Sequence, residues 1–326
     1  MPKKILITGG AGYVGSVLTP KLLQEGYEVN VIDLMIYGDT LPKHKNLKIF
    51  KNDIRDSKNL ESALKNVEIV IHLACISNDP SFELDKTLGK KINLDAFEPM
   101  VKLAIKQGVN RFIYASSSSV YGIKDVNNVS EDMSLEPLTD YSKYKAICEK
   151  VLLKYKSNNF IPTVIRPATV CGFSPRQRLD LVVNILTNLA YNKNQITVFG
   201  GSQFRPNIHI SDMVDSYLLL TISKPELISG KIFNVGYENH TVRSLAETVK
   251  EAVGKNVNII HSSTDDNRSY HISSKKIESE LNFKPKKKVK DAVADLVNAF
   301  KKNIFTDPLN NEIYFNIKRM QNLNLK

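Results

Sequence analysis

The sequence lacks several features that would each point to a particular class of protein. It contains no tryptophan and only three cysteines, Cys75, Cys148 and Cys171, whose number and spacing match no disulfide framework or zinc motif. No run of about 18 apolar residues occurs, so no membrane-spanning helix is expected. The apolar part of the N-terminal segment is too short for a signal peptide and ends in glycines. These absences predict a cytoplasmic protein with reduced cysteines and no metal site.

The formal net charge of +11 is a feature of many nucleic-acid-binding proteins. Here the lysines are spread along the whole chain, and the densest run, residues 284–288, directly precedes a predicted helix. No zinc-finger spacing or aromatic RNA-binding motif accompanies them. We therefore expect no nucleic-acid partner, and a positive field that favours substrates carrying phosphates.

Short β-branched segments alternate with amphipathic segments through the first half of the chain. This alternation predicts βαβ units, and hence a doubly wound parallel sheet of the Rossmann type with helices on both faces. The predicted strands are residues 4–8, 28–33, 47–51, 69–73, 111–116 and 163–167, and the predicted helices lie near 14–24, 57–65, 85–107 and 142–156.

The alternation changes after Pro167, which predicts a second, smaller α/β domain. We place a dinucleotide-binding domain at residues 1–170 and a substrate domain at 171–326. The second domain is predicted to contain helices near 179–191, 244–253 and 288–301 and a strand at 196–199. The strand-like segment 231–235 is expected to return to the main sheet.

A glycine-rich segment, TGGAGYVG, follows the first predicted strand and opens the first predicted helix. Gly10, Gly12 and Gly15 match G-x-G-x-x-G, in which glycines permit a tight turn, close approach of a pyrophosphate and helix–strand packing. The phosphates then lie at the positive end of the helix. Asp33, 18 residues beyond Gly15, can accept hydrogen bonds from a ribose diol and would repel a 2′-phosphate. The segment therefore predicts an NAD site.

Tyr141 and Lys145 are four residues apart and are expected to share one face of a helix. A free tyrosine has a pKa of about 10, too high for a base at neutral pH. A neighbouring ammonium and an oxidised nicotinamide ring would lower that pKa. Serines 116–119 lie upstream, at the end of the fifth predicted strand, where parallel sheets bind ligands. One of these hydroxyls can hydrogen-bond a reacting substrate oxygen.

With these motifs, nearly the whole chain resembles the extended short-chain dehydrogenase/reductase family, which includes nucleotide-sugar epimerases and dehydratases. The family's catalytic hydroxyl, tyrosine and lysine correspond to Ser117, Tyr141 and Lys145. Ser117 is chosen because the family's hydroxyl stands three residues before Val-Tyr-Gly, and Ser116 and Ser118 are alternatives. The resemblance implies a cofactor site made of Gly9, Gly12, Tyr13, Val14, Gly15, Asp33, Asp53, Ile54, Leu73 and Ala74, together with Tyr141 and Lys145.

The same resemblance implies substrate contacts in the second half of the chain. Residues 205–212 resemble the family's R-x-x-I-H-V-x-D segment, in which Arg205 would contact the substrate diphosphate, although a surface salt bridge is the alternative. His209 is interpreted as a buried structural histidine. Thr169 stands where many members have a substrate-binding Asn. Arg176 and Arg178 either bind the nucleotide or its phosphates or are exposed surface residues.

The predicted function is that of an NAD-dependent nucleotide-sugar epimerase. It would oxidise the sugar, at C4, by hydride transfer to NAD and return the hydride to the other face. Dehydratases of the family have acidic residues directly after the catalytic hydroxyl, where this chain has Ser118 and Ser119, so dehydration is not expected.

Two alternatives to an epimerase are kept open. Residues 174–184 resemble a segment in a subgroup that includes a GDP-heptose 4-dehydrogenase, so one alternative is a 4-dehydrogenase or 4-keto reductase, for example on a GDP-sugar. The other is a non-catalytic NAD-binding regulator, which would have no need of the Ser, Tyr and Lys set. The resemblance also implies a homodimer, formed through the helices at 85–107 and 142–156.

Overall fold

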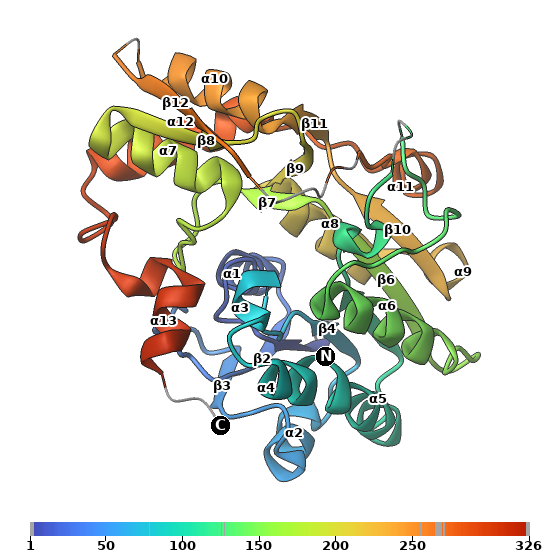
Figure 1. Ribbon diagram of the computed structural model, residues 1–326. Helices are drawn as coiled ribbons and strands as arrows, with labels where there is room; N and C mark the ends of the chain where they lie inside the picture. The colour runs from blue at the N-terminus through green and yellow to red at the C-terminus, as the bar shows by residue number, and fades with distance from the viewer. Residues whose placement is uncertain are drawn as a thin grey trace.

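The computed structural model describes residues 3–323 except 78, 125, 127, 255, 265–268 and 270. Its centre is a seven-stranded sheet in the order β10-β6-β5-β4-β1-β2-β3, in which every pair is parallel (Figure 1). The carboxyl ends of parallel strands share one edge of a sheet, where the following loops meet. The predicted doubly wound Rossmann fold is confirmed. The strands are β1 (Lys4–Thr8), β2 (Glu28–Asp33), β3 (Leu47–Lys51), β4 (Ile69–His72), β5 (Arg111–Ala115), β6 (Ile161–Pro167) and β10 (Lys231–Val235).

Helices cover both faces of this sheet, and each face has its own apolar core. Along β1, Ile5 and Ile7 point to one core, which also contains Leu18 of α1 and Met213 of α8, whereas Leu6 points to the other. Strands buried on both faces read as continuous hydrophobic runs, which is why the central strands were predictable. The first face carries α1 (Gly15–Gln24) and α8 (Ile210–Ile222), and the second carries α2 (Ser57–Leu64), α5 (Phe97–Lys106) and α6 (Asp140–Leu153).

A second group of elements, here named the smaller unit, lies beyond the carboxyl edge of the sheet (Figure 1). It contains the three-stranded sheet β11-β9-β7 and the two-stranded sheet β12-β8, with α7, α10 and α12 packed around a separate core. The division at residues 170 and 171 stays a prediction. The bounds are β7 (Thr169–Cys171), α7 (Val182–Lys193), β8 (Gln195–Phe199), β9 (Phe204–His209), β11 (Glu238–Thr241), α10 (Val242–Val253), β12 (Asn258–Ser262) and α12 (Val289–Lys301).

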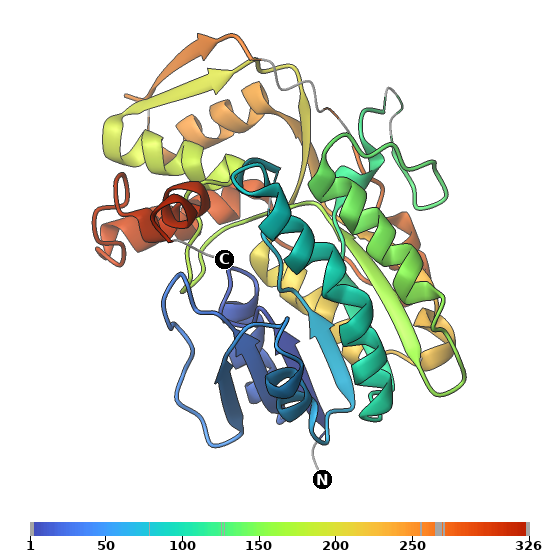
Figure 2. The same cartoon turned by 60° about the horizontal axis from the view of Figure 1, so that its bottom comes forward.

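The chain crosses between the two groups more than once. After β9 it returns to the large sheet through α8, α9 (Pro225–Ile228) and β10, which pairs with β6, and α11 (Lys275–Leu281) contacts β10. The last helix, α13 (Asn316–Asn322), contacts α3 (Asp79–Phe82) and lies on the side of the molecule that holds β2 and β3 (Figures 1 and 2). There Arg319 Nε donates a hydrogen bond of 2.7 Å to the carbonyl oxygen of Ile36.

The single helix predicted at residues 85–107 is wrong. The segment forms α4 (Lys86–Lys90), one π-helical turn (Lys91–Asp95) and then α5. Pro99 has no N–H group to donate to the preceding turn, and it lies in the first turn of α5. In the π-helical turn the Asn93 side chain hydrogen-bonds both the N–H and the carbonyl of Ile76 at 2.9 Å. These two hydrogen bonds fix the loop after β4, which lines the cavity described below.

The helices of the described residues are all too short or too polar to span a lipid bilayer.

Candidate active site

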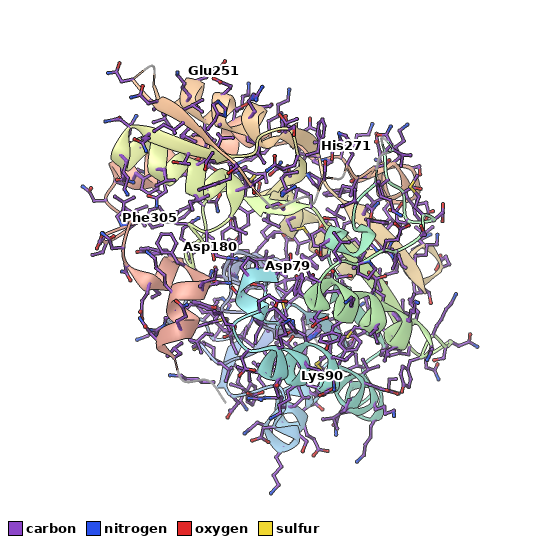
Figure 3. The ribbon with its side chains drawn as sticks, in the orientation of Figure 1. Asp79, Lys90, Asp180, Glu251, His271 and Phe305 are labelled. Atoms are coloured by element: carbon purple, nitrogen blue, oxygen red, sulfur yellow. The ribbon has the colours of Figure 1, made fainter. Side chains whose placement is uncertain are left out.

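A cavity of about 500 Å³ lies at the carboxyl edge of the large sheet, with walls from both groups of elements. This volume is in the range of small-molecule sites. Figure 3 labels two carboxylates of its wall, Asp79 from α3 (Asp79–Phe82) and Asp180 from the segment before α7. The cavity brings together every site residue predicted from the sequence: Gly9, Gly12, Tyr13, Val14, Gly15, Asp33, Asp53, Ile54, Leu73, Ala74, Ser117, Tyr141, Lys145, Thr169, Arg176, Arg178 and Arg205.

The glycine loop is shaped by close backbone contacts. Gly9 has a φ of 73°, and a Cβ there would lie 2.7 Å from the Ala74 nitrogen. A Cβ on Gly15 would lie 2.5 Å from the carbonyl oxygen of Gly9, so packing alone requires both glycines. On Gly12 a Cβ would meet only that same oxygen, at 3.1 Å, and Gly12 lines the cavity. The unpaired N–H groups at the start of α1 are therefore accessible to phosphates, which fits a dinucleotide.

Asp33 is held at the end of β2 by two backbone N–H groups. Its Oδ2 accepts from Ala11 at 3.0 Å and its Oδ1 from Met35 at 2.7 Å. Burial raises the pKa of Asp33, although these hydrogen bonds and the charge of Arg176 oppose the rise. A carboxylate has about four acceptor positions, so two ribose hydroxyls can still bind. This geometry suits the ribose role predicted from the sequence.

Asp53, one of the predicted cofactor residues, also lines the cavity. It forms an ion pair with Arg55, with 2.7 Å between Arg55 Nη2 and Asp53 Oδ2. Burial acts to raise the pKa of Asp53, but hydrogen bonds and charge from Arg55 outweigh it and lower the pKa. Asp53 is therefore ionised and fixed in orientation.

Tyr141 and Lys145 lie on one face of α6, as their spacing predicted. Thr139 caps this helix, and a reciprocal capping box with Ser142 fixes its first turn. Lys145 Nζ donates to the carbonyl oxygen of Ala115 at 2.7 Å and lies 5.8 Å from the centroid of the Tyr141 ring. Burial raises the pKa of Tyr141 well above its usual value, although a hydrogen bond with Ser117 opposes the rise. In the protein alone Tyr141 is therefore a neutral phenol.

The three candidate serines have different surroundings. Ser116 Oγ donates to Glu149, a buried carboxylate whose Oε2 lies 2.6 Å from Arg166 Nη2. Ser118 is buried in the first turn after β5. All three serines line the cavity, and Ser117 is the one whose hydroxyl acts to lower the pKa of Tyr141. Geometry therefore favours Ser117 over its neighbours for a role beside the tyrosine.

The two arginines of the segment before α7 are buried, so the alternative that they are exposed surface residues is wrong. Arg178 forms a forked pair with Asp180, with N–O distances of 2.9 and 3.2 Å. Arg176 hydrogen-bonds Asn316 instead. On the smaller unit, Thr169 of β7 and Arg205 of β9 face the cavity, and Arg205 Nη1 donates to the Phe204 carbonyl at 3.0 Å. Cationic side chains on this wall suit an anionic ligand.

Several cavity residues were not predicted from the sequence. Asp79 accepts a hydrogen bond from Thr139 Oγ1, at the start of α6. Tyr37, Asp180 and Asn316 also line the cavity. Tyr37 follows Asp33 by four residues and Asp180 lies within residues 174–184, but the motifs there did not single out either side chain. Asn316 is far from any recognised motif, and its place at the cavity comes from tertiary packing.

The remaining chemistry-bearing groups are structural. His209 caps α8 and lies 3.1 Å from Asp295, and burial lowers its pKa. The three cysteines are unpaired thiols. Among the described residues, no group of three or more His, Cys, Asp or Glu side chains is arranged to hold a metal ion.

Comparison with known proteins agrees with this geometry. The model of the NAD dependent epimerase/dehydratase family matches residues 5–236. A protein of Bacillus subtilis (strain 168) described as an uncharacterized UDP-glucose epimerase is 32% identical over 271 residues, which cover 77% of this chain and 83% of the relative.

Two solved structures with bound ligands have the same fold. The UDP-glucose 4-epimerase of Thermotoga maritima, solved with UDP-glucose, has a TM-score of 0.85 and 26% identity, covering 93% of this chain and 100% of that chain. MoeE5, solved in complex with UDP-glucuronic acid and NAD, has a TM-score of 0.82 and 25% identity, covering 92% of this chain and 99% of that chain.

Proposed function

Because the chain belongs to the NAD-dependent epimerase/dehydratase family, we propose that it is a nucleotide-sugar epimerase acting at C4 of the sugar. It is an enzyme of an NAD-dependent family, and its glycine loop and Asp33 fit that cofactor. The observation that carries the proposal is that Ser117, Tyr141 and Lys145 line the same cavity as the glycine loop. When bound, NAD would supply the hydride acceptor and return the hydride.

In this proposal the chain's own residues move one proton and hold the sugar. Tyr141, as the phenolate, takes the proton of the C4 hydroxyl and later gives it back, and Ser117 orients the reacting oxygen. Since burial raises the pKa of Tyr141, the phenolate needs positive charge nearby. Lys145 supplies part of it and is placed to hold the cofactor ribose, while the oxidised nicotinamide ring supplies the rest.

The remaining predicted residues anchor the substrate. Arg205 and Arg178 would bind the nucleotide diphosphate, and Thr169 would contact the sugar or the base. If the binding energy lies in the nucleotide and diphosphate, the sugar can turn between the two hydride transfers while it stays attached. Ser118 and Ser119 cannot act as the acid and base that water elimination needs, which disfavours a dehydratase.

Incubating the purified protein with NAD and a panel of UDP-, GDP-, dTDP- and CDP-sugars tests this proposal. NADH absorbance is followed, and the sugar product is identified by NMR. A C4 epimer with no net NADH supports the proposal. Stoichiometric NADH with a keto sugar would instead identify a 4-dehydrogenase. If the protein binds NAD and a nucleotide-sugar but converts none of the panel, the non-catalytic alternative replaces the epimerase.

From the family resemblance alone we also propose a homodimer that buries α5 and α6. Light scattering on the purified chain tests this, because a mass near the 36.7 kDa of one chain contradicts it.

A further inference from the structure

Arg176 is a buried cation without a matching anion. Its side chain is 3% exposed, and its guanidinium carbon lies 3.7 Å from the centroid of the Tyr37 ring. Nη2 donates to Asn316 Oδ1, but within the described part of the chain Nε and Nη1 have no hydrogen-bond partner. Buried charges are usually paired, because removing them from water is costly. Two unused donors that face a cavity therefore point to an absent ligand.

The neighbouring Arg178 is also a buried cation, but it has a carboxylate partner. Arg178 is similarly buried, and it takes both carboxylate oxygens of Asp180. Both oxygens of Asp180 are thereby occupied, and Arg176 bonds no carboxylate of the described residues. Burial and the charge of Arg178 lower the pKa of Arg176 to about 10, which leaves it charged at neutral pH. The missing partner is therefore an anion.

The position of Arg176 indicates which anion. Its backbone N–H donates to Ser16 Oγ in the first turn of α1, at 3.3 Å, and Ser174 Oγ donates to the Tyr13 carbonyl at 2.7 Å. Residues 172–180, here named the bridging segment, thus dock on the helix end that binds phosphates. The Arg176 charge also acts on Asp33, the predicted ribose residue. Arg176 therefore lies on the cofactor side of the cavity.

Asn316 ties Arg176 to the C-terminal helix. Besides accepting from Arg176, Asn316 donates its Nδ2 to Ser77 Oγ at 3.0 Å and its backbone N–H to Asp180 Oδ2 at 2.9 Å. The start of α13, the bridging segment and the loop after β4 are thereby joined at the cavity wall, near Asp180 in Figure 3. Such a connection holds the guanidinium in one orientation.

We propose that Arg176, positioned by Tyr37 and Asn316, binds a phosphate of the adenosine diphosphate moiety of NAD and retains the cofactor between turnovers. The inference rests on the proposed function in taking NAD as the ligand of this cavity, but it does not depend on which reaction follows. It moves Arg176 from the substrate side, where the sequence placed it, to the cofactor side.

Release of NAD tests the proposal directly. Wild type, Arg176→Gln, Arg176→Lys and Asn316→Ala are loaded with NAD and freed of excess by gel filtration. Loss of NAD is then followed after excess ADP-ribose is added as a trap. We expect Arg176→Gln to release NAD about tenfold faster than wild type or more, because it loses a charged hydrogen bond. Arg176→Lys and Asn316→Ala should speed NAD release by less. Lys90→Gln, on the exposed surface, serves as the control.

Affinity for UDP, measured by calorimetry on the same variants, shows on which side the residue acts. Unchanged UDP affinity with faster NAD release supports the proposal. NAD release at the wild-type rate from Arg176→Gln overturns it, and so does weaker UDP binding with unchanged NAD release. Neither ligand is turned over, so a failed epimerase assay leaves this result intact. Thermal unfolding of Arg176→Lys shows whether faster release comes from a damaged fold, which would also count against the proposal.

Discussion

The hydroxyl of Tyr13 donates a hydrogen bond of 2.7 Å to the carbonyl oxygen of Gly172, 159 residues further along the chain. Tyr13 belongs to the glycine loop of the large sheet and Gly172 begins the bridging segment after β7, so this bond joins the two at the cavity. Asn184 Nδ2 donates to the same hydroxyl at 3.0 Å. Burial raises the pKa of Tyr13, which keeps the phenol protonated and able to donate.

Replacing Tyr13 with Phe should therefore destabilise the protein. The change leaves the buried Asn184 amide without this acceptor, and we expect a loss of about 1–3 kcal/mol in the free energy of unfolding. Urea denaturation measures it. Tyr155→Phe is the matched control, because the Tyr155 hydroxyl bonds Glu98 on the surface. Equal losses for the two variants would contradict the role given to Tyr13.

Tyr141→Phe should remove turnover while NAD still binds. Loss of the base is expected to lower kcat by about two to four orders of magnitude, since general acid–base catalysis contributes that much. NAD affinity, measured by calorimetry, should change little because the ring remains. Tyr144→Phe on the same helix is the control and should keep its activity. Wild-type activity in Tyr141→Phe would eliminate the proposed base.

His72 should make the protein less stable in acid. Its Nδ1 lies 2.6 Å from Thr8 Oγ1, and burial, with the nearby charge of Lys145, lowers its pKa to about 3. In the unfolded chain a histidine has a pKa of about 6.5. Between these values only the unfolded state takes up the proton, so stability is full above pH 6.5 and falls as the pH drops toward 3.

The contribution of His72 has a limiting slope of about 1.4 kcal/mol per pH unit. Unfolding free energies of wild type and His72→Asn over this pH range measure it, and the variant should lose that part of the slope. The control is His44→Asn, at an exposed histidine, which should leave the slope of the wild type unchanged. Parallel pH profiles for wild type and His72→Asn would show that His72 titrates normally.

Glu149→Gln should be strongly destabilising. The carboxylate forms a buried ion pair with Arg166 and accepts from Ser116, so neutralising it leaves the arginine charge uncompensated. Breaking one partner of a buried pair costs about 3–5 kcal/mol. Glu25→Gln, in an exposed pair with Lys21, should cost less than about 1 kcal/mol. Chemical denaturation of both variants gives the comparison, and similar small losses would refute the structural importance of the Glu149 pair.

The central fold could be predicted because its inner strands, β1, β4 and β5, are mostly apolar and buried on both faces. The predicted bounds of β1, β2, β3 and β10 coincide with those observed. The prediction failed for β9 and α8. β9 contains Pro206 and Asn207, residue types that are depleted in strands, and α8 follows it at Ile210 with no connecting loop, so neither element was predicted. The π-helical turn at Lys91–Asp95 depends on the bond between Asn93 and Ile76, a contact that the sequence alone does not reveal.

Sequence motifs identified most of the candidate site residues. The contacts that each of them makes depend on tertiary structure and could not be predicted. Ser116 and Ser117 cannot be distinguished by spacing alone, and they separate only because Ser116 bonds the buried Glu149. Arg176 was assigned to the substrate because the segment around it resembled a nucleotide-sugar subgroup. Its contacts with Tyr37 and Asn316, 139 residues before it and 140 after it, were inaccessible to that reasoning.

The return of β10 to the sheet has a consequence for biosynthesis. Translation completes β6 at Pro167, but its parallel neighbour β10 begins only at Lys231. Until β10 is made the nascent chain has an open strand edge at β6, and until α8 ends at Ile222 it also lacks side chains that cover one sheet face. Such intermediates are prone to aggregate. The ribosome-bound chain therefore has its greatest need of a chaperone within this interval, and a rare-codon pause placed there would lengthen the exposure.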